Sequence, residues 1–110
     1  MKTKYGYYSS DQIASIKTSI RKSIFFLLLY VDPDTKGEYP NINVGDAFRS
    51  LQYRLNGLNR ILLEPPELVE TMSLLEEALS EYLSDEFNFR KYRKLILDAG
   101  SEIMRVKEAD

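Results

Sequence analysis

The sequence predicts an all-α fold, a single-domain antiparallel four-helix bundle with a longer loop between the first two helices. Apolar residues recur at steps of three and four along most of the 110 residues, which is the spacing of one helix face. Prolines at positions 33, 40, 65 and 66 divide this pattern, because the residue before a proline avoids helical geometry. Apolar and polar residues nowhere alternate over more than a few positions, so no strand is expected.

The first helix is expected over residues 10–31, after an N-terminal arm of residues 1–9. Ser9 and Gln12 have the spacing of a capping box, and Pro33 follows the end of the helix. The buried stripe of this helix comprises Ile13, Ile16, Ile20, Ile24, Leu27 and Val31. The connection 32–43, rich in Pro, Gly, Asp and Asn, is long for a small bundle.

The second helix is expected over residues 44–63, with Asn43 or Asp46 near its start. Its apolar residues form a short heptad seam of Phe48, Leu51, Leu55, Leu58 and Leu62. Gly57 lies in the middle of this helix, where it costs about 1 kcal/mol relative to Ala. Its presence indicates close packing or a slight bend.

The last two helices are expected over residues 66–83 and 85–107. Pro66 suits a first helical turn, and Ser84 is the expected cap of the fourth helix. The buried faces are Leu68, Met72, Leu75, Leu79 and Tyr82 or Leu83 in the third helix, and Phe89, Tyr92, Ile96, Ala99 and Ile103 in the fourth. Their very short link makes these two helices antiparallel neighbours.

The composition excludes several kinds of site. The chain has no Cys and no His, so it has no disulfide, no thiolate nucleophile and no histidine base or metal ligand. No Lys falls where we expect it to be buried. We therefore expect a protein that is not an enzyme, with no catalytic residue, no cofactor and no metal site.

The hydropathy pattern predicts a location in the cytoplasm without a membrane span. The longest apolar run, from Ile24 to Val31, has eight residues, whereas a membrane-spanning helix needs about twenty. In a signal peptide an apolar segment follows the basic N-terminal residues, and here no such segment follows the N-terminal lysines.

The net charge of −2 conceals a separation of charge along the sequence. Residues 61–89 carry eight acidic groups and no basic one, and the segments on either side are net basic. Five of these acids fall within an arc of about 80° around the helix axis, and we name them the acidic ridge: Glu67, Glu70, Glu77, Glu81 and Asp85. The ridge is interpreted as a solvated face that cations of the fourth helix partly neutralise. The alternatives are docking of a basic partner or carboxylate ligands for a hard cation.

The second helix carries a different polar face. Its outward stripe, named here the α2 stripe, comprises Arg49, Tyr53, Asn56 and Arg60. No acidic residue lies between Asp46 and Glu64. Arg and Tyr are enriched at interaction hot spots, so the stripe is a candidate protein interface, although an ordinary polar face has the same spacing.

The first helix is apolar on more than one side. Beyond its main stripe it carries Phe25, Phe26, Leu29 and Tyr30, and a helix that is apolar nearly all round is buried nearly all round. Either the loop, the N-terminal arm with its tyrosines and the other helices cover this end, or a second chain covers it. These residues are therefore also candidate interface residues, and we expect a homodimer.

The expected function is that of a small regulatory protein that acts by binding another protein. In size and architecture the chain resembles small helical regulators, bacteriocin-immunity proteins and phage or plasmid accessory proteins of prokaryotes. This resemblance implies a binding role and assigns no residue. One alternative is a nucleic-acid-associated accessory factor that uses the arginines Arg49, Arg60, Arg90 and Arg93.

A second alternative is a magnesium-dependent enzyme. The acids Glu67, Glu70, Glu77 and Glu81 resemble the carboxylate-rich helices of all-α nucleotide pyrophosphatases, which implies hydrolysis of a nucleotide. Such a site needs acids from two helices that converge inside the bundle. Here the acids lie opposite the apolar stripe of their helix.

Overall fold

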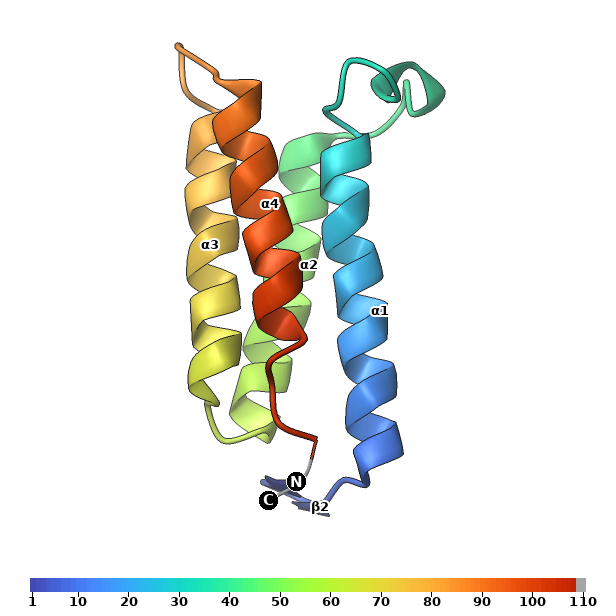
Figure 1. The fold of residues 1–110 in the computed structure, drawn as a ribbon, viewed down its shortest axis with the longest axis vertical. Coiled ribbons are helices and arrows are strands. Elements are labelled where there is room, and N and C mark those ends of the chain that lie inside the picture. The colour runs from blue at the N-terminus through green and yellow to red at the C-terminus, as the bar shows by residue number, and fades with distance from the viewer. Residues whose placement is uncertain (109–110) are drawn as a thin grey trace.

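The computed structural model describes residues 1–108, and residues 109 and 110 of the predicted domain lie outside the described residues. The prediction of an all-α fold is confirmed, because the described chain is mostly helical. The helices are α1 (Ser10–Leu29), α2 (Val44–Ile61), α3 (Pro66–Tyr82) and α4 (Phe89–Ile103). Figure 1 shows them side by side, and each helix begins near the end of the molecule where the preceding one finishes.

Local capping fixes the starts of the first two helices as the sequence predicts. The Ser9 Oγ atom accepts a hydrogen bond from the N–H of Gln12 at 3.1 Å, and the Gln12 side chain accepts one from the N–H of Ser9 at 2.7 Å. This is a complete capping box. The Asn43 side chain caps α2 by accepting from the N–H of Asp46 at 2.9 Å.

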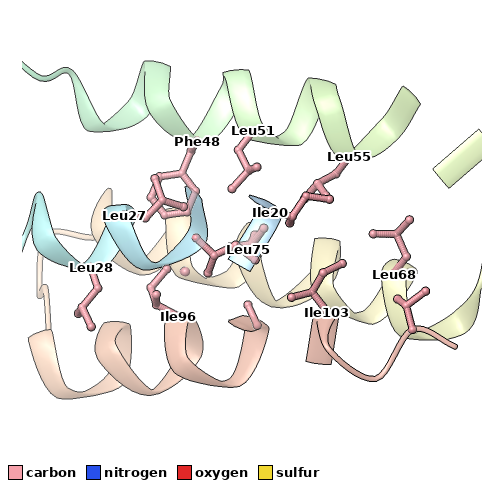
Figure 2. Close-up of a cluster of buried hydrophobic side chains, with 14 of the residues drawn as sticks. Ile20, Leu27, Leu28, Phe48, Leu51, Leu55, Leu68, Leu75, Ile96 and Ile103 are labelled. Atoms are coloured by element: carbon pink, nitrogen blue, oxygen red, sulfur yellow. The ribbon is translucent and has the colours of Figure 1, made fainter. Parts of the chain in front are cut away.

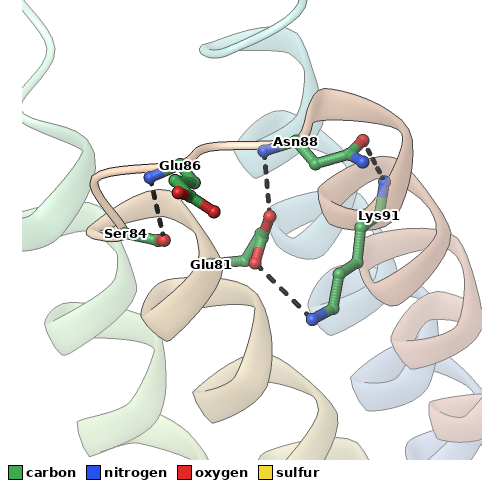
Figure 3. Close-up of polar contacts among 5 residues, drawn as sticks. All are labelled: Glu81, Ser84, Glu86, Asn88 and Lys91. Carbon is green, nitrogen blue, oxygen red and sulfur yellow. Dashed lines mark hydrogen bonds and ion pairs between the residues drawn. The ribbon is translucent and has the colours of Figure 1, made fainter.

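The predicted start of the fourth helix is wrong. α4 begins at Phe89, and its cap is Asn88, whose side-chain oxygen accepts from the N–H of Lys91 at 3.2 Å. Ser84 instead accepts from the N–H of Glu86 in the preceding turn (Figure 3). The predicted ends also lie beyond the observed ones, since α1 ends at Leu29 and α4 at Ile103.

One apolar core runs through all four helices. Figure 2 shows Leu27 and Phe48 close to each other in this core, with Leu75 and Ile96 nearby. The predicted seam of α2 is largely confirmed, although Leu58 is only partly buried. In α3 the fully buried positions are Leu68, Thr71, Leu75 and Ala78, so the buried face is centred about one position away from the predicted one.

Tyr92 joins α4 to the end of α1. Its side chain is fully buried, and its hydroxyl donates to the carbonyl of Leu27 at 2.5 Å. The N–H of Val31, four residues after Leu27, donates to Leu28 instead. The tyrosine hydroxyl therefore satisfies a carbonyl that the end of the helix leaves without a backbone donor.

The loop between α1 and α2 folds back onto α1. It contains one turn of 3₁₀ helix, η1 (Lys36–Glu38), and the Thr35 hydroxyl donates to the carbonyl of Leu29 at 2.7 Å. The Tyr39 ring packs edge-on against Tyr30 and Phe26, with ring centroids 5.0 and 6.3 Å apart. The loop is thus an ordered cover for this end of the helix.

The N-terminal arm contains a small hairpin that the sequence did not predict. Strand β1 (Lys2–Thr3) pairs antiparallel with β2 (Gly6–Tyr7). Strands of two residues are too short for an alternating pattern to reveal. The N–H of Lys4 donates to the carbonyl of Ile61 at 2.8 Å, which fastens the arm to the end of α2.

Candidate functional site

The α2 stripe faces outward as predicted. All four of its residues are exposed, and Tyr53 leaves 83% of its surface accessible although it is a large aromatic residue. Arg49 forms an ion pair with Asp46 one turn earlier in the same helix. An exposed ion pair of this kind contributes little stability, so Asp46 and Arg49 can exchange this contact for another at little cost.

Three stripe residues also border a groove between α2 and α3. The groove has a volume of about 580 Å³, and Arg49, Tyr53 and Asn56 line it together with Gln52, Met72, Glu76 and Leu79. Arg60 lies outside it. The Gln52 amide nitrogen donates to the carbonyl of Met72 at 3.2 Å, while its oxygen is buried without a hydrogen-bond partner.

Gly57 is exposed on the same side of α2, beside the stripe. A Cβ atom added there would meet no other atom within 4 Å. The sequence suggested close packing or a slight bend as the reason for this glycine. Close packing within the chain is therefore not the reason.

The acidic ridge is only partly a solvated face. Glu70, Glu77 and Asp85 are exposed, and Glu67 is half-buried. The Glu81 side chain is only 11% exposed, so it does not belong to the solvated face that the sequence predicts for the ridge.

Glu81 instead holds the turn before α4 (Figure 3). Its carboxylate accepts from the N–H of Asn88 at 2.9 Å and lies 3.7 Å from the Nζ atom of Lys91. Among the described residues, Lys91 is the α4 cation that pairs with the ridge, and Lys94 pairs with Asp98 at 2.9 Å instead. Glu81 therefore has a structural role in the α3–α4 connection.

The extra apolar residues of α1 have different surroundings. Tyr39 of the loop covers Phe26 and Tyr30, and Leu29 is half-buried. Phe25 keeps 49% of its surface accessible. The N-terminal hairpin lies at the other end of α1 from these residues (Figure 1).

A second groove lies between α1 and α4, with a volume of about 360 Å³. Its lining includes Phe25 of α1 and Leu97 of α4. Sequence reasoning missed this site because nothing in the local pattern shows that α1 and α4 are neighbours. The one signal in the sequence was that Leu97 is apolar but lies outside the apolar stripe of its helix.

The arginines proposed for nucleic-acid binding are not brought together. Arg49 and Arg60 point outward from α2, and Arg90 and Arg93 point outward from α4. Helix α4 packs against α1 and α3, whereas α2 lies behind it in Figure 1. The two pairs thus belong to different faces of the molecule.

Lys17 is buried, contrary to our expectation that the chain has no buried Lys. Its Nζ atom donates to the carbonyl of Val106 at 2.7 Å and to the Glu108 carboxylate at 3.2 Å. The position lies between Ile13 and Ile20 on the apolar stripe, which is the signal that sequence analysis overlooked. Lys17 fixes the segment after α4 against α1.

Within residues 1–108, no group of three or more acidic side chains comes together as a metal site would require. In the same part of the chain, no helix has both the length and the apolar character that crossing a membrane requires. The comparisons with protein-family models, curated proteins and solved structures give no match to this chain.

Proposed function

We propose that this protein is a non-catalytic interaction protein, an antiparallel helical bundle that pairs with a second copy of itself and binds another protein. The observation that carries the pairing is the self-complementary chemistry of the exposed face of α2. That face has charges of opposite sign at its two ends and an exposed aromatic ring at its centre.

The positions of these groups fit a twofold contact. Tyr53 is the midpoint between Asp46 and Arg60, which lie seven residues, or about 10 Å, to either side of it. When two copies of α2 cross antiparallel at Tyr53, Asp46 of each copy faces Arg60 of the other. A twofold interface repeats each contact, so both ion pairs form at once.

Gly57 supports the same arrangement. In this contact it faces Arg49 of the second copy, because both lie four residues from Tyr53. The space beside Gly57 is open within the chain, and the missing side chain leaves room for the arginine. Gly57 weakens the helix and improves no packing inside the chain. The proposed contact gives it a role, because it makes room for Arg49 of the second copy.

A charge swap tests the pairing. Light scattering at high micromolar concentration should give twice the chain mass of 12.8 kDa for the wild type. Asp46→Arg should shift the protein to monomer, and the double change Asp46→Arg with Arg60→Asp should restore the dimer. Lys36→Glu, an exposed charge change outside α2, is the matched control and should stay dimeric. A monomeric wild type would refute the pairing.

Direct assays separate the two other functions. For a nucleotide hydrolase, phosphate release with Mg²⁺ and a nucleoside triphosphate should fall when Glu70 and Glu77 are changed to Gln. For a nucleic-acid-associated factor, a mobility shift at about 50 mM salt should vanish when the charges of Arg90 and Arg93 are reversed. We expect neither activity.

A further inference from the structure

The groove between α1 and α4 combines apolar side chains with basic ones. Phe25 and Leu97 both line it and keep 49% and 39% of their surfaces accessible. At its floor Gly100 is buried, and the Arg21 Cγ atom lies 3.9 Å from the position that a Cβ on Gly100 would take. The stem of Arg21 thus passes close to Gly100 of α4.

Arg21 lines this groove, and α4 carries a second arginine, Arg93, one turn before Leu97. Arg21 in turn lies one turn before Phe25, so each cation flanks an apolar residue on its own helix. Neither arginine forms an ion pair with any residue of the part of the chain that the structure describes. Residues 12–31 contain no acid, and Asp98 of α4 is already paired with Lys94.

We infer that this groove receives an acidic amphipathic helix of a protein partner. The apolar face of such a helix covers Phe25 and Leu97, and its carboxylates pair with Arg21 and Arg93. This is the helix-in-groove mode of recognition, with charge complementarity at the rim. The inference rests on the proposed protein-binding function and does not depend on pairing through α2.

A second copy of this chain is the wrong occupant. A twofold contact through this face would set the arginines of one copy against those of the other. The acidic helix α3 buries its apolar side in its own core, and Val69 is the one large hydrophobic residue that it exposes among the described residues. The acidic helix α3 of a folded copy therefore has no apolar face to place in the groove.

The chemistry also favours a protein over a polyanion. Nucleic-acid contacts rest on cations and on stacking with aromatic rings, whereas Phe25 is the one aromatic residue lining this groove and the aliphatic Ile24, Ile96 and Leu97 line it too. The whole chain is net negative, which opposes broad binding to polyanions.

The test measures binding of a defined probe to the full-length protein. The probe is a labelled peptide of about 18 residues, built from Leu, Ala and Glu, with Leu at steps of three and four. The matched control peptide carries Lys in place of each Glu. Fluorescence anisotropy should show saturable binding of the acidic peptide alone, weakening as NaCl rises from about 50 to about 300 mM.

Three variants locate the binding. Phe25→Ser and Leu97→Ser should each weaken it by about tenfold or more, since both remove apolar anchors. Arg21→Glu combined with Arg93→Glu should weaken it similarly and remove most of the salt dependence. Circular dichroism checks that each variant folds, and the exposed position of both apolar side chains makes folding the expected result.

Two matched variants act as controls outside the groove. Lys36→Glu changes an exposed charge, and Leu83→Ser removes an exposed apolar side chain. Both should bind the acidic peptide within about twofold of the wild type, which is the range of effects expected away from an interface.

Several results would overturn the inference. These are no binding of the acidic peptide at about 1 mM, equal binding of the basic peptide, or binding that the groove variants leave unchanged. Tighter binding of duplex DNA or of anionic phospholipid vesicles, abolished by the two arginine changes, would assign the face to those partners instead. A dimer that does not bind the peptide refutes this inference alone, and a monomer that binds it refutes only the pairing.

Discussion

Removal of one oxygen atom tests the connection between α4 and the end of α1. Tyr92→Phe keeps the ring among its aromatic neighbours and leaves the Leu27 carbonyl without the donor 2.5 Å away. A buried acceptor left unpaired costs about 1–3 kcal/mol. Urea unfolding near neutral pH should show this loss of stability, and the melting temperature should fall by about 4 °C for each kcal/mol.

The stability difference between the wild type and the Tyr92→Phe variant should also depend on pH. Burial, and to a smaller extent the nearby Tyr82, raises the pKa of the Tyr92 hydroxyl. The unfolded chain loses this proton near pH 10 while the folded protein keeps it, so the stabilisation is complete below about pH 10 and is lost as the pH rises. At about pH 11 the wild type should have lost about 1.4 kcal/mol that the Tyr92→Phe variant retains.

Two results would refute this reasoning. One is a Tyr92→Phe variant with wild-type stability at neutral pH. The other is a stability difference between the two proteins that stays constant from about pH 7 to about pH 11. Because both proteins contain the same other tyrosines and lysines, ionisation of those groups cancels in the comparison.

Four further substitutions test the packing and the helix boundaries. Leu55→Ala should cost about 2–5 kcal/mol in urea unfolding, and a near-neutral result would contradict the buried seam of α2. Lys17→Met keeps the aliphatic stem but loses the bond to Val106, so amide exchange after α4 should accelerate, and unchanged exchange would oppose this role. Asn88→Ala should cost about 1 kcal/mol and Ser84→Ala less, whereas the reverse order would place the start of α4 at the predicted residue.

Local signals predicted most of the helices. The capping box at Ser9 and the cap at Asn43 need only residues three positions away, so the sequence contains all of the interaction. The buried seam of α2 was predictable for the same reason, because one helix face repeats at a fixed spacing.

The start of α4 was ambiguous from the sequence. Ser84 and Asn88 are both good cap residues, and the side chain of each accepts from a backbone N–H shortly after it in the chain. The choice between them depends on the Glu81 carboxylate, which accepts from the N–H of Asn88 across the turn. The helix and cap propensities of residues 84–88 alone do not reveal this contact with Glu81.

The surfaces depended on which helices are neighbours. The α2 stripe could be predicted from the spacing within a single helix. The cover that Tyr39 provides for Phe26 depends on the path of the loop, and the groove at Phe25 depends on contact between α1 and α4. Long-range contacts of this kind leave no periodic trace in a single sequence.

The hydrogen bond between the N–H of Lys4 and the carbonyl of Ile61 has a consequence for the order of folding. A hairpin with two-residue strands does not persist alone, so it forms after α1 and α2 have brought these positions together. Helices α3 and α4 are joined by a short connection and pack most extensively, which favours their early association. We therefore expect the N-terminal arm to order last during refolding, so that its protection from proteolysis reports completion of the native state.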